Sequence, residues 1–304
     1  MLIALSVLPA ALLMIFIWRR DKIEKEPLGL LIGLFFLGAL TVFPAAFIEL
    51  GLGKVLESFA AEGSTEYIVI ENFLIVALAE EGCKFTVLRL KTWRHPAFNY
   101  TFDAIVYAVF TSLGFATLEN VLYVVSSGTI GIAIMRGILS VPGHAIDAVF
   151  MGWCYGLAKR AECSGELSKK SSYLRRALLA PVLIHGFYDF SLSMEQDYFL
   201  ILFFAFEIII TIIAFRKVHE LSRNDEPLPI GTPFGVYVRS GTQQYQNPYI
   251  YQQYGQPRQY QQPGPQYTQY PQYTQPGGPY QNPYQQQPPL DSYAQRLYEE
   301  EQKR

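Results

Sequence analysis

Apolar residues fall into seven blocks along the chain, and polar residues gather between them. The blocks cover residues 2–18, 28–50, 67–89, 101–125, 131–158, 177–195 and 198–215. A helix that crosses a hydrocarbon core of about 30 Å needs roughly 20 mainly apolar residues. Because each block approaches or exceeds that length, the pattern predicts an all-α, polytopic transmembrane bundle of about seven spans.

Two of the blocks allow more than one interpretation. The fifth block is long for one span and contains Pro142 and Gly143, which predicts either a kinked helix or a short interfacial piece before the true span. The first block has the length of a signal peptide. Its basic residues, Arg19 and Arg20, follow the apolar run rather than precede it, so we expect a retained span.

Basic residues alternate in density between successive loops. They are frequent after the first, third, fifth and seventh blocks and sparse elsewhere. Since cytoplasmic loops carry the excess of Lys and Arg, the asymmetry predicts an outside N-terminus and a cytoplasmic C-terminus. The expected location is therefore a cell membrane, with the chain crossing it several times.

The chain changes character after the seventh block. Half of its 304 residues are hydrophobic and 16% are charged, yet Gln, Tyr and Pro dominate from about residue 223 onward. Such a segment cannot bury enough apolar surface to offset its ordering entropy. We predict a transmembrane domain over 1–220 and a disordered cytoplasmic tail over 221–304. The tail is either a plain flexible segment or a site of binding to itself or to other proteins.

Two adjacent carboxylates, Glu80 and Glu81, lie inside the third block. Charged groups are costly within a membrane and often mark function. Lys84 follows at helical spacings of three and four and can reach either acid. A neutralising pair with Lys84 accounts for one glutamate and leaves the second without a partner.

Three more blocks carry polar side chains at one-turn spacing. Glu119 and Asn120 lie in the fourth block, where they could supply an acid and an oxyanion donor or fix helix packing. His144 and Asp147 lie one turn apart in the fifth block, as do His185 and Asp189 in the sixth. Such a spacing allows an acid to orient the imidazole of a metal-binding histidine, or to be a ligand itself if it points the same way as the histidine. We expect these groups to share one polar site, because burying each separately is expensive.

In four short motifs the chain resembles the PrsW family of intramembrane proteases, which are related to the type II CAAX prenyl endopeptidases. Single motifs this short are weak, but four in order, each in its own apolar block, are fairly specific. The resemblance covers about residues 1–220, including the polar loop RDKIEKEP (20–27). The four motifs are EEGCK (80–84), FATLEN (115–120), PGHAIDA (142–148) and HGFYD (185–189).

The resemblance implies a peptidase that cleaves a membrane-anchored protein. For the family it also implies first-site cleavage of an anti-sigma factor in envelope stress signalling. The expected partners are this substrate and the lipid bilayer, with no nucleic acid. The rival hypothesis is a transporter or scaffold whose acids and histidines form an ion or proton path.

Two hydrolytic routes are compatible with the residues. In one, His144, His185 and Glu81 bind Zn²⁺ and the remaining glutamate is the general base. In the other, no metal takes part and Glu80 or Glu81 activates water directly. The assignment of base and partner between Glu80 and Glu81 stays open, Glu119 is a third acid, and Asp189 orients His185. His185 and Asn120 stabilise the oxyanion in the second route.

Overall fold

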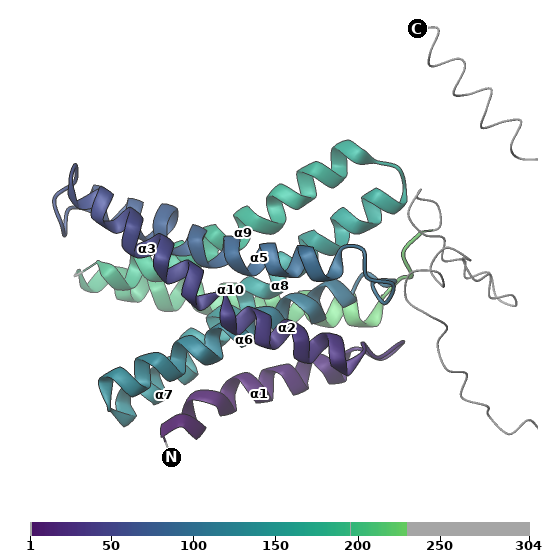
Figure 1. Ribbon diagram of the computed structural model, residues 1–304, viewed down its shortest axis with the longest axis horizontal. Coiled ribbons are helices and arrows are strands. Elements are labelled where there is room, and N and C mark those ends of the chain that lie inside the picture. Colours follow the sequence, from purple (N-terminus) through teal and green to yellow (C-terminus); the bar gives the residue numbers. More distant parts are fainter. Residues whose placement is uncertain (1, 195, 230–304) are drawn as a thin grey trace, which may run out of the picture. The chain divides into compact units, whose positions relative to one another are not determined.

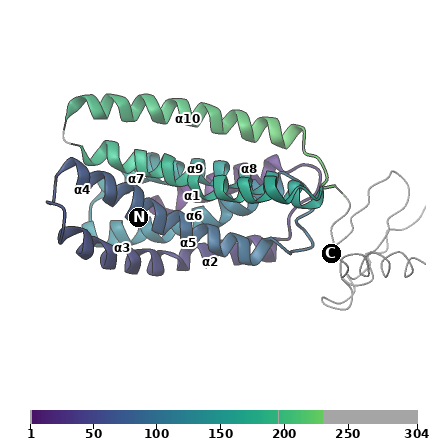
Figure 2. The ribbon, with the colours of Figure 1, turned by 90° about the horizontal axis from the view of Figure 1, so that it is seen from above.

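The computed structural model describes residues 2–194 and 196–229, and within them the chain is helical apart from short connections. The predicted all-α bundle is therefore confirmed (Figures 1 and 2). In chain order the helices are α1 (Leu2–Arg20), α2 (Leu28–Leu40), α3 (Val42–Glu57), α4 (Thr65–Val69), η1 (Ile70–Val76, a π-helix), α5 (Ala77–Thr92), α6 (Asp103–Ser127), α7 (Ile130–Ile138), α8 (Ser140–Cys163), α9 (Leu167–Ser193) and α10 (Asp197–Arg223).

Each of the seven apolar blocks corresponds to one helix or to helices joined end to end. The second block is α2 and α3, which meet at Thr41, and the third is α4, η1 and α5 in succession. The fifth block divides into α7 and α8, as the short-piece interpretation anticipated. Pro142 lies in the first turn of α8, where its missing N–H costs little.

Four of these units in the described chain meet the length and composition of a membrane span. They are 28–57, 103–127, 130–163 and 197–223. Of the most apolar window of α6, 72% is buried inside the bundle, against 11% for α10. Thus α6 forms the centre, packed against α1, α2 and α8, while α10 lies along one flank beside α8 and α9 (Figure 2). The apolar side chains that α10 exposes suit contact with lipid.

Two glycines allow α2 and α6 to touch backbone to backbone. A Cβ added at Gly38 would lie 1.9 Å from the carbonyl oxygen of Thr111, and one at Gly114 would lie 2.0 Å from that of Phe35. Small residues are typical of such close helix crossings in membranes.

Replacing Gly38 with Ala should destabilise the bundle by at least about 2 kcal/mol, because α2 must move away from α6. The midpoint of thermal unfolding in detergent measures this. Gly33→Ala is the matched control on α2, since a Cβ there meets nothing within 4 Å, and we expect no loss. Equal stability of the two variants would contradict the close packing.

The loops that carry the basic residues lie together at one end of the bundle (Figure 1). Asn99 Nδ2 donates to Glu24 Oε2 at 3.0 Å, and the backbone N–H of Leu228 donates to the carbonyl of Asn99 at 2.8 Å. Residues 221–229, which the sequence assigned to the tail, thus continue α10 to Arg223 and then pack against the loop before α6. The predicted disorder of 230–304 lies outside the described residues.

This end buries a carboxyl group in the loop between α1 and α2. Glu26 is 3% exposed and accepts a hydrogen bond from the Tyr107 hydroxyl of α6. Burial raises the pKa of Glu26 from 4.5 to about 7, partly opposed by the Tyr107 hydrogen bond. The native state therefore holds a proton on Glu26 that the unfolded chain releases above pH 4.5.

Because the pKa of Glu26 is raised in the folded protein, its contribution to stability is fully present below pH 4.5 and is lost as the pH rises through about 7. We therefore expect the midpoint of thermal unfolding to fall as the pH rises from 5 to 8. The contribution is about 1–3 kcal/mol. Glu26→Gln should flatten this fall, whereas Glu24→Gln, at an exposed position of the same loop, should not. The same fall in Glu26→Gln and wild type would contradict the assignment.

Candidate active site

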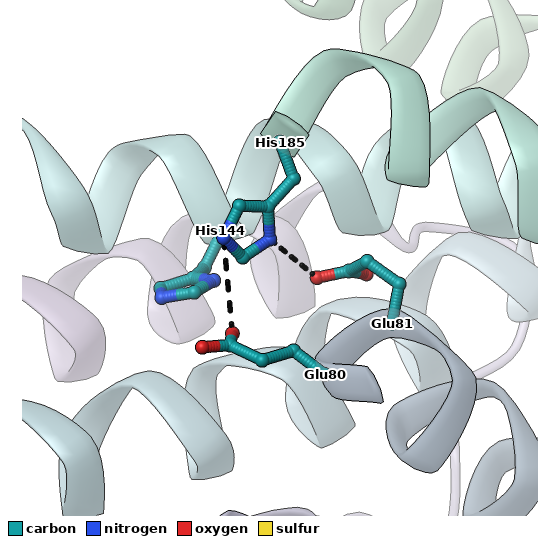
Figure 3. Close-up of side chains that lie close together, drawn as sticks. All are labelled: Glu80, Glu81, His144 and His185. Carbon is teal, nitrogen blue, oxygen red and sulfur yellow. Dashed lines mark hydrogen bonds and ion pairs between the residues drawn. The ribbon is translucent and has the colours of Figure 1, made fainter. Parts of the chain in front are cut away.

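Three helices bring two glutamates and two histidines together. Glu80 and Glu81 come from α5, directly after the π-helix η1, and His144 and His185 come from α8 and α9. One ligand atom of each lies within 4.8 Å of the others, and all four residues are buried (Figure 3). π-helices often accompany functional sites. The expectation that these groups share one polar site agrees with this geometry.

Lys84 contacts both carboxylates, at the helical spacings that the sequence suggested. Its Nζ donates to Glu81 Oε1 at 2.7 Å and to Glu80 Oε2 at 3.0 Å. It also lies 3.1 Å from His144 Nδ1 and 3.9 Å from the centre of the Phe115 ring. Lys84 has no exposed surface. Its positive charge touches both carboxylates, and this attraction offsets part of the cost of burying them.

His185 is surrounded by carboxylates. Its Nδ1 lies 3.1 Å from Glu81 Oε1 and its Nε2 lies 3.0 Å from Asp189 Oδ2. Glu80 Oε2 is 3.9 Å from Nε2 (Figure 3). The one-turn pairing of His185 with Asp189 on α9 is therefore present, and both ring nitrogens have acidic partners.

His144 has a different acid from the one its spacing suggested. Its Nε2 lies 3.0 Å from Glu119 Oε2 of α6, whereas Asp147 points to the other histidine, with Oδ2 3.7 Å from His185 Nδ1. The contact that the spacing of His144 and Asp147 allows is therefore not made. The rotation of α8 relative to α6 and α9 decides these partners. The spacing of residues along α8 carries no information about that rotation.

Asn120 turns away from the cluster. Its Nδ2 donates to the carbonyl of Ser6 on α1 at 3.1 Å, and its Oδ1 accepts from Arg136 Nε at 3.1 Å. These bonds connect α1, α6 and α7, which corresponds to the helix-packing alternative. The amide group has no donor directed at the glutamates, so the predicted oxyanion role of Asn120 does not fit the structure.

The cluster opens into a cavity of about 680 Å³. Glu80, Glu119, His144, His185 and Asp189 line its wall, together with residues of α3, η1, α7 and α10. Glu81 is not on the wall and its side chain has no exposed surface. The two adjacent glutamates therefore have different surroundings: Glu80 borders the cavity, and Glu81 is held between Lys84 and His185.

Three further charged residues line this cavity that the sequence interpretation did not select. Arg136 of α7 pairs with Glu119, with Nη2 2.7 Å from Oε2, and Glu49 of α3 and Glu207 of α10 also contribute to the wall. Each is an isolated charge in an apolar block, which is the signal that identified Glu80. None of the three belongs to a motif, so an isolated charge alone did not distinguish them from charged residues that lie at a helix boundary.

Comparison with known proteins gives the site its context. The model of the PrsW family intramembrane metalloprotease matches residues 26–215. The chain belongs to the PrsW family of intramembrane proteases. Its match contains all four residues of the cluster, so the family resemblance of the motifs is confirmed. PrsW family membership favours a peptidase over a transporter or scaffold.

Curated relatives agree with this assignment. The chain is 38% identical over 195 residues to Protease PrsW of Geobacillus kaustophilus, covering 64% of this chain and 81% of the relative. It is 35% identical to Protease PrsW of Oceanobacillus iheyensis, covering 73% of this chain and 97% of the relative. For Protease PrsW of Bacillus subtilis the identity is 32%, with 67% and 89% covered. No solved structure matches the chain.

The cluster has the donor types of a metal site. Two carboxylates and two imidazoles suit zinc, and in the described part Glu81 Oε2 is buried without a hydrogen-bond partner. Lys84 already donates to both glutamates. The donor set therefore fits a divalent cation, provided that Lys84 gives up part of these bonds.

Proposed function

We propose that the chain hydrolyses a peptide bond of a membrane-anchored protein at the cavity, with Glu80 as general base. The observation that carries this proposal is the position of Glu80 on the cavity wall, within the cluster that also holds His144 and His185. A base must reach the water that it activates. Glu81 lacks such access because its side chain is fully buried.

In the proposed reaction, Glu80 takes a proton from water while the water oxygen attacks the carbonyl carbon of the scissile bond. The same proton then passes from Glu80 to the leaving amine as the C–N bond breaks. Glu81 and Asp189 hold the ring of His185 from its two nitrogens, and Glu119 holds that of His144. Both imidazoles are thereby fixed in place to act on the developing oxyanion or on a metal.

His144, His185 and Glu81 are the residues that would hold a metal, most simply Zn²⁺. Such an ion, when bound, lowers the pKa of a coordinated water toward about 7 and polarises the carbonyl. The metal-free alternative leaves the base role with Glu80 and assigns oxyanion stabilisation to the two imidazoles. Asn120 is omitted from both routes, since its amide is bound to Ser6.

The proposed substrate is an anti-sigma factor that spans the membrane once, cleaved first in an envelope stress cascade. This part rests on family resemblance. The proposed orientation places the N-terminus outside and the C-terminus in the cytoplasm, because the basic loops gather at one end of the bundle. His185 lies near the middle of the sixth apolar block, 177–195, so cleavage is expected near the centre of the bilayer.

The test is cleavage of a single-span model substrate by the purified full-length protein in nanodiscs, with products mapped by mass spectrometry. We expect two fragments from a cut within the spanning segment. Incubation with a chelator, followed by metal analysis and addition of Zn²⁺, separates the two routes. Loss and recovery of cleavage support the metal route, and unchanged cleavage in a metal-free sample supports direct activation by Glu80. Absence of cleavage alongside ion-dependent uptake into proteoliposomes would contradict the proposed function.

A further inference from the structure

Glu207 is an isolated carboxylate in the most apolar of the four candidate spans. Between Asp197 and Arg216, α10 has no other charged residue, and its window has the highest mean hydropathy of the four candidate spans, 2.6. A charge in such a segment is expensive and usually serves a function. Its side chain lines the cavity that contains the catalytic cluster.

Asp147 of α8 supplies a second unsatisfied carboxylate to the same cavity. It is 3% exposed, and its Oδ1 has no hydrogen-bond partner in the described part of the chain. Its other oxygen lies 3.7 Å from His185 Nδ1. Glu207 and Asp147 line the same cavity, and two carboxylates in one cavity repel each other unless a cation lies near them.

Of the described basic residues on the cavity wall, His185 lies beside Asp147, and none is paired with Glu207. Arg136 on the wall is already bound to Glu119 and Asn120. Lys84 is not on the wall and donates to Glu80 and Glu81. Among the described residues Glu207 makes no hydrogen bond or ion pair, so this side of the cavity offers a carboxyl group whose oxygens are open to a donor from a bound cationic side chain.

We propose that Glu207 and Asp147 form a subsite that accepts a cationic side chain, Lys or Arg, of the substrate polypeptide. Because Asp147 adjoins His185, the basic residue lies one or two positions from the scissile bond, given a spacing of about 3.5 Å per extended residue. Charge complementarity of this kind selects among partners more than it adds affinity. The subsite rests on the proposed peptidase function, since it gives that cavity a sequence preference.

The test measures binding and cleavage separately. Fluorescent single-span peptides that differ only in carrying Lys, Gln or Glu at successive positions of the spanning segment are bound to the Glu80→Gln protein in nanodiscs. At one position we expect Lys to bind about tenfold more tightly than Glu, with Gln between them. Adding Glu207→Gln should reduce this ratio to within about twofold.

Glu220→Gln is the matched control, because Glu220 also belongs to α10 but lies at its exposed end, paired with Lys217. It should keep the tenfold ratio. If Glu207→Gln does not fold, Asp147→Asn should reduce the ratio in its place. The subsite is overturned if no position discriminates Lys from Glu, or if discrimination survives both substitutions.

Cleavage of the same peptides by wild type keeps the two hypotheses apart. Charge-dependent binding without any cleavage would overturn the proposed function and leave the subsite in place. Cleavage of all peptides at equal kcat/KM, with equal binding, would overturn the subsite alone. Cleavage with a preference for Lys that Glu207→Gln abolishes would support both.

Discussion

Replacing Glu80 with Gln should lower kcat for cleavage of a single-span substrate by about 10²–10⁴-fold, because the amide cannot accept the proton of the attacking water. Gln keeps the volume of the side chain and an oxygen that can accept from Lys84 Nζ, now at 3.0 Å. KM should change little, since the substitution removes an interaction that matters in the transition state. Initial rates with the purified protein in nanodiscs measure both constants.

The matched control is Glu66→Gln, at an exposed position in α4, which continues through η1 into α5. It should leave both constants near those of wild type. If Glu80→Gln retained more than about a tenth of wild-type kcat, Glu80 would not be the base. A loss confined to Glu81→Gln would transfer the role to Glu81.

Replacing His185 with Gln should have a comparable effect, about 10²–10⁴-fold on kcat/KM. The imidazole lies within 3.9 Å of four carboxylates, so its removal takes away the group around which the acids are arranged. Asp189→Asn should cost less, about 10–100-fold, because Asp189 acts by orienting the ring. Kinetics of the two variants over a pH series measure this difference.

His95→Gln serves as the control, since His95 lies in the loop between α5 and α6 and does not line the cavity. Its kinetics should match those of wild type. Equal losses for His185→Gln and His95→Gln would indicate general damage to the fold. Full activity of His185→Gln would remove this histidine from the mechanism.

Hydropathy was sufficient to predict the helical units, because each span must satisfy its backbone hydrogen bonds internally and expose apolar side chains to lipid. It did not predict the division of 28–57 into α2 and α3. There Pro44 lies in the first turn of α3 and Thr41 donates its hydroxyl to the carbonyl of Gly38 at 2.6 Å. The π-helix at 70–76 has no signature in the apolar pattern either.

The residues of the site could be predicted from the sequence. Their hydrogen-bond and ion-pair partners could be predicted only in part. Glu80, Glu81, His144 and His185 were identifiable because polar groups in apolar blocks are costly to bury separately. The contact of Lys84 with both acids and that of His185 with Asp189 follow from helical spacing. The pairing of His144 with Glu119 and the direction of Asn120 depend on how α1, α6, α7 and α8 are rotated against each other, which one sequence does not specify.

The central claim is that acids and imidazoles from separate helices act as one hydrolytic centre. A double-mutant cycle on Glu80→Gln and His185→Gln, measured as single-turnover cleavage of the single-span substrate, tests it most directly. If the two residues act as a unit, the double variant should be no more than about threefold slower than the slower single variant. Losses that multiply would show that the two residues act independently and would contradict the claim.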